Sequence, residues 1–106
     1  MTPFQRIDVD HAMQLLERDD CQLLDIRDIQ SFQQGHIQGA KHLDGASVED
    51  FVLNADPNAP LVIYCYHGNS SQQAAMFFHD KAFNDVYSVD GGYEVWQQRY
   101  PESTRR

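Results

Sequence analysis

The sequence predicts an α/β fold with a mostly parallel five-stranded sheet and helices on both faces. Five strand-like runs alternate with five helical patterns along 106 residues. Such alternation requires crossover connections, which place strands in parallel and helices over the sheet. The length fits a single domain over residues 1–106, with enough chain to form a core without metal or disulfide support.

Each element is expected from its own apolar pattern and from the polar residues beside it. The strands are expected over Gln5–Val9, Cys21–Ile26, Ala40–Leu43, Leu61–Cys65 and Asp85–Val89. The helices are expected to begin near Asp10, Asp28, Ser47, Ser70 and Gly92.

Several of these helices carry end signals. Asp10 is a natural N-cap for the first helix. The run Ser47–Asp50 resembles a capping box, and Pro101 is expected to end the last helix. The helix from Ser70 has small and aromatic residues at helical spacing, namely Ala74, Ala75, Phe78 and Ala82.

The net charge of −8 argues against nucleic acid or an anionic membrane as a partner. No run approaches the roughly 20 apolar residues that span a bilayer. The first residues, Met1–Arg6, show no signal-peptide pattern, so we expect a cytoplasmic protein.

The two cysteines, Cys21 and Cys65, differ in their surroundings. A disulfide between them is the less favoured alternative, because cytosolic thiols are kept reduced. Cys21 opens an apolar run and is expected to be a small buried hydrophobe.

Cys65 stands where an apolar strand stops and a helix is about to start. Ligands bind at this edge of open α/β sheets. The polar loop that follows comprises Tyr66, His67, Gly68, Asn69, Ser70 and Ser71. Loop amides, serine hydroxyls and the positive end of the helix can stabilise a thiolate, so Cys65 is the candidate nucleophile.

Three other interpretations of Cys65 compete with this one. It could be a structural cysteine at a strand end, or a metal ligand with His67, although no second ligand pair has metal-finger spacing. Phosphatase chemistry also uses a cysteine loop before a helix. Such loops carry an arginine six residues after the cysteine to clamp phosphate, and this chain has Ser71 there.

The motifs together resemble the rhodanese family of sulfurtransferases over nearly the whole chain. The matching segments are Leu24–Arg27 with Phe32 and Gly35–Leu43, the loop Cys65–Ser70, and Val86–Gly92 followed by Trp96. The loop departs from the larger two-domain thiosulfate enzymes, which carry basic loop residues where this chain has Tyr66 and His67. It also lacks the Cys-Gly-Ser/Thr-Gly pattern of the mercaptopyruvate enzymes.

The resemblance implies a rhodanese domain that needs no cofactor and uses thiosulfate as its sulfur donor. Cys65 would attack the outer sulfur and hold it as a persulfide. Cyanide or a thiol, such as that of a thioredoxin-like dithiol protein, would then accept the sulfur in a ping-pong reaction.

Supporting roles follow from position. Asp25 and Arg27 are expected to form an ion pair after the second strand, although Arg27 could also lend positive potential to Cys65. Gly91 is expected to be a turn glycine that lets another loop approach the site. Two other functions stay open: a persulfide carrier module served by protein partners, and a non-catalytic binding domain.

Overall fold

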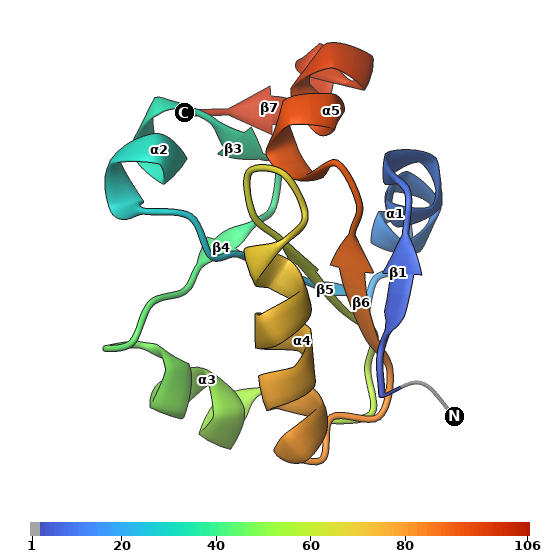
Figure 1. Cartoon of the computed structure of the whole chain (residues 1–106), viewed down its shortest axis with the longest axis vertical. Coiled ribbons are helices and arrows are strands. Elements are labelled where there is room, and N and C mark those ends of the chain that lie inside the picture. The colour runs from blue at the N-terminus through green and yellow to red at the C-terminus, as the bar shows by residue number, and fades with distance from the viewer. Residues whose placement is uncertain (1–2) are drawn as a thin grey trace.

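The computed structural model describes residues 3–106, and its centre is a sheet of five strands (Figure 1). The strand order is β1-β6-β5-β2-β4, and every neighbouring pair is parallel. The strands are β1 (Gln5–Ile7), β2 (Gln22–Asp25), β4 (Lys41–His42), β5 (Leu61–Tyr64) and β6 (Val86–Val89). The five predicted strands are therefore confirmed, each slightly shorter than its apolar run.

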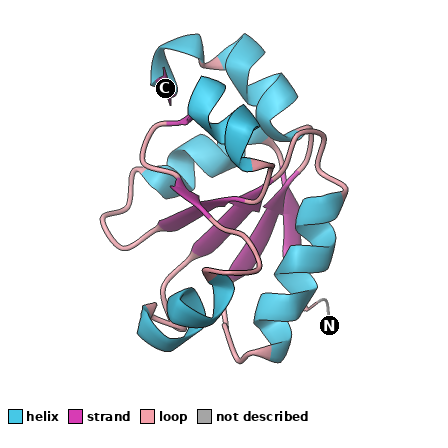
Figure 2. Ribbon diagram, turned by 90° about the vertical axis from the view of Figure 1, so that its left-hand side faces the viewer, coloured by secondary structure: helices cyan, strands magenta, loops and turns pink. Residues whose placement is uncertain are grey.

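Helices cover both faces of the sheet, as predicted (Figure 2). The helices are α1 (Val9–Leu16), α2 (Ile29–Gln34), α3 (Val48–Asn54), α4 (Ser70–Asp80) and α5 (Gly92–Arg99). On one face, α1 and α5 pack around Tyr64 and Trp96. On the other, α3 and α4 bury Phe51 and Phe78 against Leu61. Trp96 is fully buried, as expected for a core residue.

A second small sheet lies outside the main one and was not predicted. Strand β3 (His36–Ile37) pairs antiparallel with β7 (Thr104–Arg105), which follows the 3₁₀-helix η1 (Pro101–Ser103). Two-residue strands carry no alternation pattern, so only the long-range pairing defines them. Pro101 does follow the end of α5, as predicted.

The N-cap prediction for the first helix was wrong by two residues. Asp8 is the N-cap, and its carboxylate accepts from the His11 amide at 2.8 Å. Asp10 instead lies in the first turn of α1, where Arg99 donates to it at 3.0 Å.

Two further helix-end predictions were also wrong. Ser47 precedes α3, but its side chain does not cap the helix. The carboxylate of Asp44 accepts from the Ser47 amide instead, at 3.0 Å. Ala82 lies beyond the end of α4 in a left-handed conformation, with φ of 69°.

The parallel topology brings the carboxyl ends of β2, β5 and β6 to one edge of the sheet. The loop after β5 lies at this edge, at the start of α4 (Figure 1). Among residues 3–106, no helix has the length and apolar character needed to span a bilayer.

Candidate active site

The thiol of Cys65 is surrounded by hydrogen-bond donors from its own loop. The Gly68 amide donates to Sγ at 3.1 Å and the Ser71 amide at 3.4 Å. The Ser71 hydroxyl lies 3.5 Å from the same sulfur. Cys65 is only 7% exposed, so these donors act in a site with little competing water.

These contacts favour the charged form of the sulfur. Burial by itself raises the pKa of the Cys65 thiol, since desolvation penalises a thiolate. The Ser71 hydroxyl and the amides of Ser71, Gly68 and His67 outweigh burial, and the pKa of Cys65 lies below its ordinary value. A lowered pKa is the property that a sulfur nucleophile requires.

The first turn of α5 forms hydrogen bonds with the backbone of the Cys65 loop. The Tyr93 amide donates to the Cys65 carbonyl at 2.9 Å, and the Glu94 amide donates to the Tyr66 carbonyl at 3.1 Å. The loop is therefore attached to a helix at two successive carbonyl groups, which limits its freedom before a substrate binds.

Glycines make this close approach feasible. Gly91 and Gly92 have φ of 82° and 56°, in the left-handed region. A Cβ on Gly92 would lie 2.6 Å from the Tyr66 carbonyl oxygen, so a larger residue there would push the loop away. Gly91 has the positive φ expected of a turn glycine, but the close contact with the Cys65 loop is made by Gly92.

Other loop residues point to the surface. Asn69 and Ser70 are exposed, and Asn69 is the N-cap of α4 without a side-chain cap. Neither Ser70 nor Ser71 is the N-cap residue, and Ser71 is fully buried with its hydroxyl against the sulfur.

The side chains of Tyr66 and His67, the two residues after Cys65, are exposed on the surface of the loop. Tyr66 is exposed, and its ring packs edge-on against the His67 ring, with 4.6 Å between the two ring centroids. His67 Nδ1 lies 3.6 Å from a carboxylate oxygen of Glu94. The negative charge of Glu94 therefore lies beside His67, a contact that was not predicted from the sequence.

Asp25 and Arg27 form the expected ion pair at the end of β2. Arg27 Nη2 donates to Asp25 at 2.7 Å and to the Gly35 carbonyl at 2.6 Å. Burial lowers the pKa of Arg27, but its bonds with Asp25 dominate and the pKa is raised. The guanidinium also lies 4.0 Å from the centre of the Tyr93 ring. These contacts link β2 to the segment after α2, and none of them reaches Cys65.

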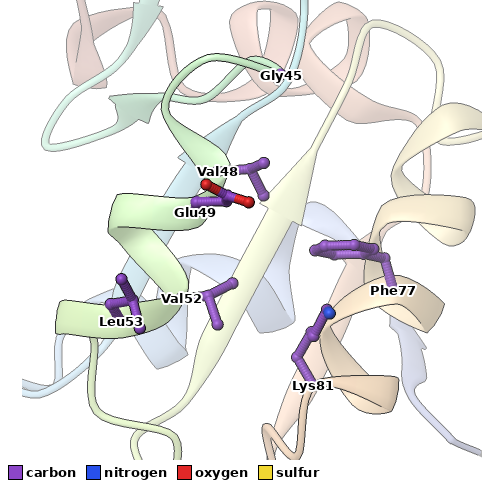
Figure 3. Close-up of a pocket in the computed structure, with 7 residues that line it drawn as sticks. All are labelled: Gly45, Val48, Glu49, Val52, Leu53, Phe77 and Lys81. Carbon is purple, nitrogen blue, oxygen red and sulfur yellow. The ribbon is translucent and has the colours of Figure 1, made fainter.

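One hollow of the surface borders the Cys65 loop, and a second one lies away from it. A polar cavity of about 270 Å³ is lined by Arg27, Tyr66 and Tyr93. A wider groove separates α3 from α4, where Val48 and Val52 face Phe77 (Figure 3). No residue of the Cys65 loop lines this groove, so the groove is separate from the candidate active site.

Ser88 is a further buried polar neighbour of the site, and its role was not predicted from the sequence. Its hydroxyl lies 2.8 Å from the Ser71 hydroxyl, and it is fully buried. A serine inside the otherwise apolar run of β6 was the available signal. Within residues 3–106, no cluster of three or more His, Cys, Asp or Glu side chains is suited to a metal ion.

Known proteins are similar to this chain over nearly its whole length. The chain is 51% identical over 104 residues to the thiosulfate sulfurtransferase GlpE of Pseudomonas putida F1, covering 98% of this chain and 94% of that protein. It is 55% identical over 101 residues to the enzyme of the same name from Pseudomonas aeruginosa LESB58, covering 95% and 91%.

Solved structures share the fold at low identity. A rhodanese-like domain from Anabaena has a TM-score of 0.82 at 22% identity, covering 99% of this chain and 80% of that one. A rhodanese-like domain protein from Staphylococcus aureus has a TM-score of 0.75 at 24% identity, covering 88% and 91%. The rhodanese-like domain model matches residues 8–99, and the chain belongs to this family.

Proposed function

We propose that this chain is a thiosulfate sulfurtransferase that works through a persulfide on Cys65. The single observation that carries the proposal is the set of two amides and one hydroxyl directed at a buried sulfur. The names of relatives that are 51% and 55% identical support the choice of donor.

The first step is a displacement at sulfur. The Cys65 thiolate attacks the outer sulfur of thiosulfate, a new S–S bond forms, and the S–S bond of thiosulfate breaks. Sulfite leaves with the electron pair, and an anionic persulfide remains on Cys65. The loop amides that surround Sγ favour negative charge held at this position.

The second step returns the thiolate. A nucleophilic acceptor attacks the terminal sulfur of the persulfide, and the Cys65 thiolate leaves. Cyanide or a thiol fits this role, and a thioredoxin-like dithiol protein is the macromolecular form of such an acceptor. Exposed Tyr66 and His67 beside the thiol leave room for an approaching acceptor.

Phosphoryl transfer is the alternative chemistry for a cysteine loop, and the geometry disfavours it. A phosphatase loop needs a bidentate arginine on the phosphate. Here Ser71 occupies that position, and Arg27 is engaged by Asp25 and Gly35.

Intact-mass measurement tests the proposal directly. Treating the reduced protein with thiosulfate should add the mass of about one sulfur atom, located on Cys65 by peptide mapping, and cyanide should remove it. A protein that gains no mass, or gains it on Cys21, would contradict the covalent mechanism.

Removing the negative charge of Glu94, which lies beside His67, should improve thiosulfate binding. We expect Glu94→Gln to lower the KM for thiosulfate about twofold, because Glu94 lies beside His67 and repels a dianion. In that background, His67→Lys should lower KM further, since its added charge is no longer neutralised.

The matched control is Glu49→Gln on α3, which makes the same change of net charge away from the loop. Steady-state kinetics with thiosulfate should show no comparable change for this variant. Equal decreases in KM for both variants would mean that the net charge of the protein, and not the charge of Glu94, governs thiosulfate binding.

A further inference from the structure

A buried chain of two hydroxyl groups leads away from the reactive sulfur. The hydroxyl of Ser71 in α4 lies 3.5 Å from Cys65 Sγ. The hydroxyl of Ser88 in β6 lies 2.8 Å from the Ser71 hydroxyl. Both serines are fully buried. We propose, building on the sulfurtransferase function above, that Ser88 is a positioning residue that holds the Ser71 hydroxyl hydrogen on the Cys65 sulfur.

The hydrogen bonds open to the Ser71 and Ser88 hydroxyl groups favour the charged form of Cys65. With a thiolate, Ser88 donates to Ser71 and Ser71 donates to sulfur, so each hydroxyl hydrogen has an acceptor. A neutral thiol can place its own hydrogen only on Ser71, the one acceptor that Sγ contacts among residues 3–106, and Ser71 must then donate to Ser88. The Ser88 hydrogen is then stranded, because its hydroxyl bonds only to Ser71 among residues 3–106. A buried donor without an acceptor is costly, so the pair favours the anionic sulfur.

The position of Ser88 explains why a polar residue occurs in this strand. Val86 and Ser88 lie on the same face of β6, which packs against α4, and Val86 joins the apolar core there. A hydroxyl in that layer loses its water, and its hydrogen bond to Ser71 compensates for the loss. The same contact restricts the rotation of the Ser71 side chain.

Alkylation kinetics measure this role without depending on sulfur transfer. In a Cys21→Ala background, Cys65 is the only thiol, and its rate of reaction with iodoacetamide against pH reports its pKa. We expect Ser88→Ala to raise the pKa of Cys65 by about half a unit to one unit. The rate well below that pKa then falls roughly three- to tenfold.

The matched control is Val86→Ala, a truncation on the same face of the same strand. It should destabilise the fold but leave the alkylation profile unchanged, because it removes packing and no hydrogen bond. If Val86→Ala raises the pKa as much as Ser88→Ala, the effect is one of packing and the proposal fails.

A double-mutant cycle tests whether Ser88 acts on Cys65 through Ser71. Ser71→Ala should raise the pKa more than Ser88→Ala, and the double variant should match Ser71→Ala, since Ser88 acts only through Ser71. Additive shifts, or a Ser88→Ala profile identical to the parent's, would overturn the inference. Mass gain with thiosulfate is scored separately, so a parent protein that fails to load sulfur refutes the proposed function and not the hydroxyl chain.

Discussion

We expect the Cys65→Ser variant to lose sulfur transfer completely while keeping its fold. The substitution is nearly isosteric, and the Gly68 and Ser71 amides can donate to an oxygen in place of Sγ. A serine hydroxyl is not ionised near neutral pH and cannot hold a persulfide. Thiosulfate:cyanide assays should give no turnover above background, with an unchanged circular dichroism spectrum.

The control for this variant is Cys21→Ser. Cys21 is half-buried, and burial followed by the charge of Asp20 raises its pKa to about 11. It is therefore protonated at neutral pH, and turnover should survive its replacement. Residual activity in pure Cys65→Ser protein would remove Cys65 from the mechanism. Cys65-dependent hydrolysis of aryl phosphates by the parent would favour phosphatase chemistry instead.

The second large effect is on stability, at the buried ion pair. Asp25→Asn leaves the Arg27 guanidinium without its charge partner in a site where Asp25 is fully buried. Breaking a buried pair from one side costs about 3–5 kcal/mol, because the remaining charge is uncompensated. Urea unfolding should show this loss in the free energy of unfolding.

The chain offers a matched control in the exposed pair of Arg6 and Asp90, whose nitrogen and oxygen lie 2.9 Å apart. Asp90→Asn should cost less than about 1 kcal/mol, since water screens that pair. The double variant Asp25→Asn/Arg27→Met should recover part of the loss by removing the stranded charge. Equal losses for Asp25→Asn and Asp90→Asn would show that burial does not set the strength of these pairs.

Local patterns were sufficient for the five strands of the main sheet and the five helices, but not for the β3–β7 pair or for the exact helix ends. Asp8 and Asp10 are both suitable N-cap residues. Asp8 is the N-cap because β1 ends at Ile7 and α1 begins at Val9. Similarly, Ser70 and Ser71 are equivalent in sequence terms. The helical rotation of about 100° per residue turns one to solvent and the other to the sulfur.

The sequence by itself determined the alternation of strands and helices, the position of Cys65 directly after β5, and the ion pair of Asp25 with Arg27. Each of these depends on residues that are neighbours along the chain. Only the tertiary structure decided the contacts of Ser88 and Glu94, which come to the Cys65 loop from β6 and α5. Parallel strands bring their carboxyl ends to one edge whatever their separation in sequence, so the surroundings of the sulfur are set by packing between distant segments.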